Sequence, residues 1–173
     1  MVVSIPKPKK RAKKAFKPLR RSYIKRSTKP LRKRGKSPYK IAKRKAWDAF
    51  SRFIRLRDAL KTTGTTTILL CYTCDKEYPA FGLGCAQAGH FIEGRGNLVL
   101  FDERQVHGQC YNCNVNLKGR WSVYLRKMRL EHGVDLVETM IESKLDELKL
   151  SIDELGDIQR IYEAKYLLLL KTI

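Results

Sequence analysis

The sequence predicts an α+β protein in which a zinc-stapled ββα core is flanked by helices and preceded by a disordered basic arm. Three observations carry this prediction. All of the net positive charge lies near the start of the chain, two Cys-x-x-Cys motifs with short β-like runs occupy the middle, and helical hydrophobic periodicity lies on both sides of them. A length of 173 residues suits one compact domain with appendages.

Residues 1–36 form the predicted arm. Up to Lys45 the chain holds 20 Lys and Arg side chains and no acidic one, so the net charge of +20 belongs to this region and the rest is neutral. Four prolines interrupt a run of like charge that cannot collapse on itself, which favours disorder. Interleaved aromatic residues favour nucleic-acid contact over binding to a membrane surface. The arginines expected to contact phosphates here are Arg20, Arg21, Arg32 and Arg34.

Two absences exclude other protein classes. The arm has no apolar run of signal-peptide length, and the longest aliphatic run, residues 167–170, is far shorter than the ~20 residues that cross a bilayer. We therefore expect a cytoplasmic protein with no membrane partner. Five cysteines, four of them in Cys-x-x-Cys pairs, favour metal binding over a disulfide framework.

An amphipathic helix is predicted over residues 37–64. Ser37 and Pro38 are typical of an N-cap followed by proline at the first helical position, and Gly64 is expected to end the helix. The apolar residues between them recur at helical spacing and predict a packed face. The basic residues on the other faces, which can reach phosphates, are Lys40, Lys43, Arg44, Arg52 and Arg55.

Residues 65–120 contain the predicted zinc-stapled core. Two Cys-x-x-Cys motifs stand 35 residues apart, and two such motifs complete a tetrahedral four-thiolate zinc site. The predicted ligands are Cys71, Cys74, Cys110 and Cys113. A closed four-thiolate zinc has no open coordination position, so we expect a structural Zn²⁺. Cys85, the odd cysteine, is interpreted as a free thiol.

The insertion between the motifs contains QAGHFIEGRGN and LVLFDERQVHGQC, which predict two short strands joined by a glycine-rich turn. With a helix after Cys113, this is a ββα arrangement. His90 then lies on the first strand and Asn114 begins the helix that faces it. Arg95 and Arg120 are close enough in sequence to be phosphate contacts, although ordinary surface arginines are an equal alternative.

Helices are predicted again over residues 121–173. The first runs from Trp121 to a stop at Gly133, and apolar periodicity resumes from Val134 to Leu148. A capping box, Ser151 to Glu154, opens the last helix. These helices either pack on the core or form the interface of a homodimer.

The segment from residue 47 to residue 119 resembles the NinG/Rap recombination endonucleases of lambdoid and related phages. The residues that carry the resemblance are FSRFIRLRDALKTTG (50–64), the CYTC motif, QAGHF, LFDER and VHGQCYNCNVNLKG (106–119). The knuckle-embedded ββα unit is also similar to HNH nucleases of treble-clef type and to phage Holliday-junction resolvases. The resemblance implies a metal-dependent DNA endonuclease that acts on branched recombination intermediates in the bacterial host cytoplasm, alongside recombination proteins.

In such enzymes a strand histidine deprotonates the attacking water, and a divalent ion, Mg²⁺ or Mn²⁺, is bound between strand and helix. His90 matches the base, Asn114 matches the metal ligand, and Gln105 matches a position that orients the base through a hydrogen bond. HNH enzymes commonly have an aspartate ligand where this chain has Gly89. The second ligand therefore stays open, and the candidates for it are His107, Asp102, Glu103 and His90 itself.

Several interpretations stay open at this point. Without the resemblance, His90 is equally well a satisfied polar residue or an extra zinc ligand. His107 either supports the zinc site, is hydrogen-bonded in the turn or binds the catalytic metal, and His132 is interpreted as favouring its helix terminus. The alternative function is a zinc-containing nucleic-acid-binding protein without hydrolytic activity, and a ribosomal or RNA-packaging protein is a third class.

Overall fold

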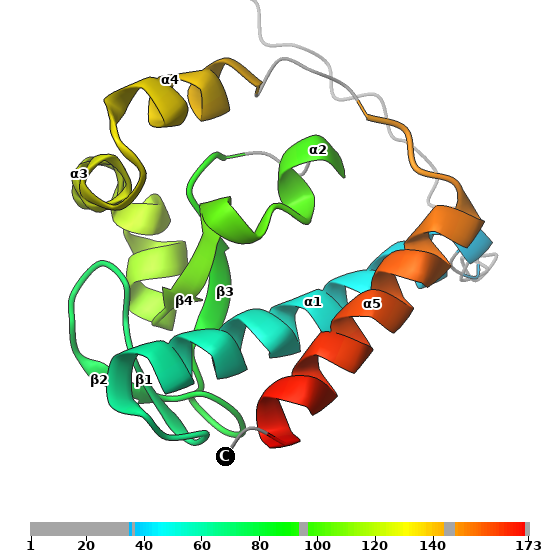
Figure 1. Ribbon diagram of the computed structural model, residues 1–173, viewed down its shortest axis with the longest axis horizontal. Coiled ribbons are helices and arrows are strands. Elements are labelled where there is room, and N and C mark those ends of the chain that lie inside the picture. Colours follow the sequence, from blue (N-terminus) through cyan, green and yellow to red (C-terminus); the bar gives the residue numbers. More distant parts are fainter. Residues whose placement is uncertain (1–34, 36, 94–96, 144–147, 172–173) are drawn as a thin grey trace, which may run out of the picture. The chain divides into compact units, whose positions relative to one another are not determined.

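The computed structural model describes residues 35, 37–93, 97–143 and 148–171 (Figure 1). Within it, Gly35–Ile173 forms one unit by its internal contacts. Helices and small antiparallel sheets alternate along this unit, so the predicted α+β class is confirmed. The predicted arm, residues 1–36, lies outside the described residues except for residue 35. Five predicted phosphate contacts lie outside them as well: Arg20, Arg21, Arg32, Arg34 and Arg95.

Helix α1, Pro38–Thr63, confirms the predicted first helix. The side chain of Ser37 accepts a hydrogen bond from the backbone N–H of Lys40 at 3.4 Å, and proline occupies the first turn where no N–H is needed. Gly64 ends the helix in the left-handed conformation, with φ at 69°, and its N–H donates to Leu60 O. Local capping chemistry thus sets both ends of α1.

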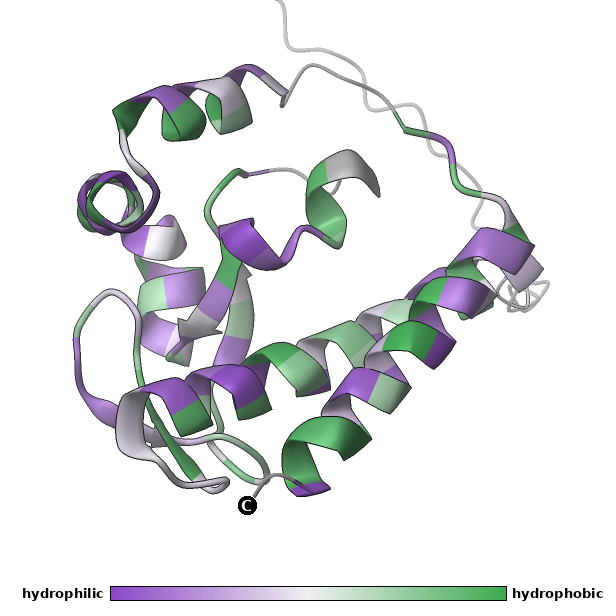
Figure 2. Cartoon of the chain, viewed as in Figure 1, coloured by the Kyte–Doolittle hydropathy of each residue, from purple (hydrophilic) through white to green (hydrophobic). Residues whose placement is uncertain are grey.

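Helix α5, Ile152–Lys171, packs along α1. The predicted capping box is confirmed, because Ser151 N–H donates to the Glu154 carboxylate at 2.7 Å and Glu154 N–H donates to Ser151 Oγ at 3.2 Å. Between the helices, the Tyr162 ring meets Phe50 edge-on at 4.7 Å. Figure 2 shows both helices as alternating hydrophobic and hydrophilic bands, typical of helices with one buried face.

Two antiparallel hairpins lie between these helices in sequence. The first pairs β1, Ile68–Leu70, with β2, Glu77–Pro79, and the turn between them carries Cys71 and Cys74. The second pairs β3, Gln87–His90, with β4, Val106–Gln109, and Cys110 follows directly. Each Cys-x-x-Cys motif therefore begins directly after the last residue of a strand, and that strand fixes its position.

The second predicted strand is shorter than expected. Residues 97–105 form a helical turn, α2 (Asn97–Leu100), and a 3-10 turn, η1 (Glu103–Gln105), so the strand begins only at Val106. Asp102 gives the physical reason, because its side chain accepts a hydrogen bond from Arg104 N–H at 3.0 Å. This local bond stabilises a turn in a stretch whose apolar residues suggest a strand.

Helix α1 also anchors β4. Asp58, which is buried on α1, accepts a hydrogen bond from the backbone N–H of Gly108 at 2.6 Å. Its neighbour Arg57 donates to Glu103 O at 2.7 Å and to Val106 O at 2.8 Å. These charge-assisted hydrogen bonds fix the position of β4 along α1.

After the second motif the chain does not form one continuous helix. A π-helical turn, η2 (Asn112–Asn116), and a 3-10 turn, η3 (Lys118–Arg120), precede α3 (Trp121–His132) and α4 (Val134–Glu142). The break falls at Gly119, with φ at 77°. The predicted stop at Gly133 is confirmed, whereas the helix predicted to reach residue 148 ends at Glu142, with residues 144–147 outside the described part.

Helices α3 and α4 close a second core. Tyr124 and Met128 from α3 and Val137 from α4 pack around Phe91, which follows β3. The Tyr124 hydroxyl donates to Gly89 O at 3.1 Å and so ties α3 to β3. Among the described residues, no helix is both long enough and apolar enough to cross a membrane.

Candidate functional site

The four predicted zinc ligands converge in the structure. The sulfur atoms of Cys71, Cys74, Cys110 and Cys113 all lie within 4.8 Å of one another. Three of them are buried, while Cys74 is half-buried. Backbone N–H groups point at the sulfurs, from Cys110 to Cys71 Sγ at 3.3 Å and from Cys113 to Cys110 Sγ at 3.4 Å.

The electrostatics of this cluster fit a cation. Burial raises the pKa of the Cys71 thiol, but backbone hydrogen bonds to its sulfur outweigh burial and lower that pKa to about 7. Burial and the neighbouring Cys71 thiolate raise the pKa of Cys74 to about 12, and burial also raises the pKa of Cys113. Four thiolates side by side need a positive ion, and Zn²⁺ takes this ligand set. The structure therefore contains a possible zinc-binding site at the predicted residues.

Cys85 lies outside this cluster. Its sulfur accepts a hydrogen bond from Arg55 Nη1 at 3.3 Å, in the loop before β3. It is a half-buried free thiol, in agreement with the interpretation from the sequence.

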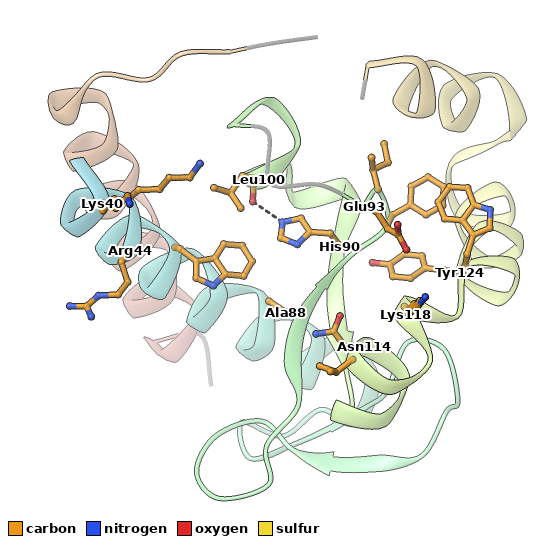
Figure 3. Close-up of a pocket in the computed structure, with 16 residues that line it drawn as sticks. Lys40, Arg44, Ala88, His90, Glu93, Leu100, Asn114, Lys118 and Tyr124 are labelled. Atoms are coloured by element: carbon orange, nitrogen blue, oxygen red, sulfur yellow. Dashed lines mark hydrogen bonds between the residues drawn. The ribbon is translucent and has the colours of Figure 1, made fainter. Parts of the chain in front are cut away.

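A cavity of about 600 Å³ lies between α1, β3 and the segment that follows Cys113. Its lining residues are Lys40, Lys43, Arg44, Trp47, Ala88, His90, Phe91, Ile92, Glu93, Leu100, Asn114, Val115, Lys118, Gly119, Trp121 and Tyr124. Figure 3 shows His90 in its middle, with Lys40 and Arg44 on one side and Asn114 and Lys118 on the other. The structure thus brings the predicted base, the predicted metal ligand and three basic residues that were expected to reach phosphates to the same pocket.

His90 is the last residue of β3, and the contacts of its ring include an indole and a backbone carbonyl. The ring stacks on Trp47 with centroids 5.0 Å apart, and Nε2 lies 3.2 Å from Leu100 O (Figure 3). A carbonyl oxygen only accepts hydrogen bonds, so Nε2 carries the proton in this contact. In the neutral imidazole, the basic lone pair is then on Nδ1.

Asn114 lies in η2 across from β3. Its Nδ2 donates to Gln87 Oε1 at 2.7 Å, which directs Oδ1 toward Gly89. A Cβ atom at Gly89 would lie 3.0 Å from Asn114 Oδ1 and 2.1 Å from Gln109 Oε1. The missing side chain of Gly89 therefore leaves room for two amide oxygens against the strand.

Gln109 is a residue that the sequence did not single out. It is fully buried, its Nε2 donates to Thr73 Oγ1 and to Gly119 O, both at 3.0 Å, and its Oε1 has no hydrogen-bond partner. A buried oxygen without a partner is costly. Gln109 Oε1 and Asn114 Oδ1 both face the Gly89 gap, and amide oxygens are among the ligands that hard divalent ions accept.

Three predicted site residues lie elsewhere. Gln105 is buried, and its Nε2 donates to Asp102 at 2.9 Å while its Oε1 has no partner, so it makes no hydrogen bond to His90. His107 does not line the pocket and stacks on Tyr72 instead, with centroids 4.0 Å apart. Arg120 donates a hydrogen bond to Thr73 O at 3.0 Å. It therefore stabilises the turn that carries Cys71 and Cys74, and it does not line the pocket.

The two acidic candidates for the metal are also engaged away from the pocket. Asp102 pairs with Arg104 at 2.8 Å, and Glu103 pairs with Lys165. Glu93 is a carboxylate that does line the pocket, and nothing in the sequence singled it out. Lys118 and Tyr124 also line the pocket and were missed, because only the tertiary fold brings these three residues to His90.

One family model matches the chain, that of the bacteriophage lambda NinG protein, over residues 4–172. The chain belongs to the NinG family. The NinG match confirms the family that the motifs of residues 47–119 indicated, a phage recombination-related family, and extends it into both flanking regions. The searches of curated proteins and of solved structures found no match for this NinG family member.

Proposed function

We propose that this NinG family member is a divalent-metal-dependent endonuclease that hydrolyses phosphodiesters in branched DNA recombination intermediates, of the Holliday-junction or D-loop type. One observation carries the proposal: His90 and Asn114 share a pocket whose rim holds the cations Lys40, Lys43 and Arg44. A base, an amide-oxygen ligand and phosphate-binding cations are the parts that metal-assisted phosphodiester hydrolysis needs. The resemblance of residues 47–119 to phage recombination endonucleases supports a branched substrate.

The protein groups have separate roles in this proposal. His90 Nδ1 takes a proton from the attacking water, and Trp47 and Leu100 O keep the ring in the orientation that presents Nδ1. The cations of α1 hold the phosphodiester and bring its phosphorus into line with the water. The four-cysteine site holds β4 and η2 in place, so that Asn114 faces β3.

A divalent ion would be held by Asn114 Oδ1 together with Gln109 Oε1, and it would supply stabilisation of the charge that develops on the phosphate and the leaving oxygen. Glu93 is a further oxygen donor of the same pocket. Mg²⁺ and Mn²⁺ suit this oxygen-rich set, and neither needs a thiolate.

The experiment compares cleavage and binding of labelled four-way junctions and linear duplexes in Mg²⁺ or Mn²⁺. His90→Ala should lower the cleavage rate by roughly 10²–10⁴-fold, the usual contribution of a general base, while binding persists. Asn114→Ala should also lose cleavage. Asn116→Ala is the matched control, because Asn116 lies in the same η2 turn but bonds Asn112 and does not line the pocket.

The second candidate is a zinc-containing nucleic-acid-binding protein without hydrolytic activity. Gly89 favours it, since HNH enzymes commonly have an aspartate ligand at that position. Cleavage by the wild type that His90→Ala abolishes supports the nuclease. Tight junction binding without cleavage by the wild type in either metal would instead establish the binding protein.

A further inference from the structure

A second group of metal-binding side chains lies apart from the four cysteines. His107 comes from β4, and Glu131 and His132 come from the last turn of α3. One ligand atom from each of the three lies within 4.8 Å of the other two. None of the three lines the pocket around His90.

The two imidazoles present unused nitrogen atoms. Nε2 of His107 and Nε2 of His132 are both buried, and neither has a hydrogen-bond partner. His107 is only 5% exposed. Buried nitrogens normally find a partner, because leaving one unsatisfied costs the loss of its hydration. Two unpartnered imidazole nitrogens beside the Glu131 carboxylate therefore indicate a site where a metal ion can bind to all three side chains.

Two charged residues lie beside Nδ1 of His107, and Nε2 is the ring nitrogen without a protein partner. Its Nδ1 lies 3.8 Å from Asp58 Oδ2 and 3.4 Å from Arg57 Nη2. Arg57 Nε donates to Asp58 Oδ1 at 2.7 Å, and Arg57 Nη2 donates to Val106 O at 2.8 Å. A metal bound at Nε2 would place the ring proton on Nδ1, and Asp58 is the acceptor for that proton once Arg57 Nη2 moves away from Nδ1, as in carboxylate–histidine–metal arrangements.

The remaining groups keep the His107 imidazole neutral and the Glu131 carboxylate anionic. Burial is the main reason that the pKa of His107 falls to about 4, so its ring is neutral at neutral pH. The pKa of Glu131 is lowered: burial raises it, but the Lys61 ammonium and the other polar neighbours outweigh burial. Its Oε2 accepts from the Tyr72 hydroxyl at 3.1 Å.

Lys61 competes with an ion for Glu131, because its ammonium bonds Glu131 Oε1. The Lys61 side chain is 61% exposed, so it can turn into solvent when a divalent cation replaces it. Tyr72 stays in place on its side of the carboxylate, with its ring stacked on His107.

We propose that His107, Glu131 and His132 bind a second transition-metal ion of the zinc class, which ties the end of α3 to β4. Two imidazoles and one carboxylate suit Zn²⁺ and other borderline ions better than Mg²⁺. His107 pairs with Gly89 across the hairpin. The ion therefore braces the strand pair beside the gap where Gln109 and Asn114 meet β3.

Metal content of the full-length protein tests this proposal. The protein is saturated with Zn²⁺, freed of excess by gel filtration and measured by elemental analysis. We expect Glu131→Gln and His132→Gln to hold one zinc ion fewer per chain than the wild type. Glu138→Gln is the matched control, since Glu138 lies on the neighbouring α4, pairs with Arg129 of α3 and should leave the zinc content unchanged when replaced.

Substitution with Co²⁺ separates loss of this site from misfolding and from binding in the His90 pocket. The four-thiolate site gives intense thiolate-to-cobalt charge-transfer absorption, which should persist in Glu131→Gln while the weaker bands of a nitrogen and oxygen site disappear. A wild type that holds only the four-cysteine ion overturns the proposal. So does a second ion that Asn114→Ala removes and Glu131→Gln retains, an outcome that would leave the proposed nuclease site intact.

Discussion

Alanine at Gly89 adds one methyl group at the point where two side chains meet β3. The new Cβ would lie 2.1 Å from Gln109 Oε1, closer than real Cβ contacts allow, and 3.0 Å from Asn114 Oδ1, which is tighter than most real contacts. Gly89 is not among the described glycines with positive φ, so the backbone itself accepts alanine. The whole effect must come from these two side chains.

The size of the effect follows from Gln109. This side chain is fully buried and must turn away, which breaks the bonds of its Nε2 to Thr73 and Gly119. Overpacking costs about 1–3 kcal/mol and each hydrogen bond contributes about 0.5–1.5 kcal/mol. Since these contributions overlap, we expect Gly89→Ala to lower the free energy of unfolding by about 2–4 kcal/mol.

Urea unfolding of the zinc-saturated protein, followed by far-ultraviolet circular dichroism, measures this change. Gly156→Ala in α5 is the control, because its nearest neighbour would be Arg160 Nη1 at 3.9 Å and alanine favours a helix by about 0.5–1 kcal/mol. Gln109→Ala removes the clash, so in that background Gly89→Ala should cost far less. An unchanged urea midpoint for Gly89→Ala would refute the close packing of Gln109 on β3.

Three further predictions concern the zinc, the pocket cations and acid stability. Cys113→Ser should lose the zinc and unfold the region around both cysteine turns, because metal binding energy is folding energy here; a folded variant with unchanged zinc content contradicts the four-thiolate site. Replacing Lys40, Lys43 and Arg44 together by glutamine should weaken junction binding and reduce the slope of log K against log salt by about 1 for each phosphate that is no longer neutralised; an unchanged slope removes these cations from the interface. Hydrogen bonds from Arg104 and Gln105 outweigh burial and lower the pKa of Asp102 below its ordinary value of 3.8, so its carboxylate stabilises the fold above that pH and the contribution is lost as pH falls below it. Asp102→Asn should therefore lose less stability than the wild type between neutral pH and pH 3 in acid titrations, and parallel curves would show that the carboxylate contributes nothing.

Features set by neighbours in sequence could be predicted from the sequence. Ser37 and Pro38 at the start of α1, Gly64 at its end and the Ser151–Glu154 capping box act through bonds within one turn of chain. The four-cysteine cluster was predictable for a similar reason, because Cys-x-x-Cys spacing itself directs two thiols at one ion. The placement of His90 and Asn114 in one pocket followed from the ββα order.

Features that depend on distant segments could not be predicted. Asp102 ends the apparent strand through a local bond, but distant side chains that include Tyr162 and Arg57 hold the resulting turn in place. The role of Gln109 depends on the missing side chain of Gly89 across the hairpin. His132, interpreted from sequence as a helix-end residue, meets His107 only because α3 returns to β4.

The pairing of α1 with α5 has a consequence for the order in which the protein assembles. Phe50 and Phe53 receive the Tyr162 ring from a helix that the ribosome makes after the other described elements. Until α5 emerges, the apolar face of α1 that supports Trp47 beneath the pocket stays uncovered. Both cysteine turns are made before α5. Chains truncated before α5 should therefore still bind zinc at the four-cysteine cluster, while α1, whose Trp47 stacks on His90, lacks its packing partner and the pocket stays incomplete.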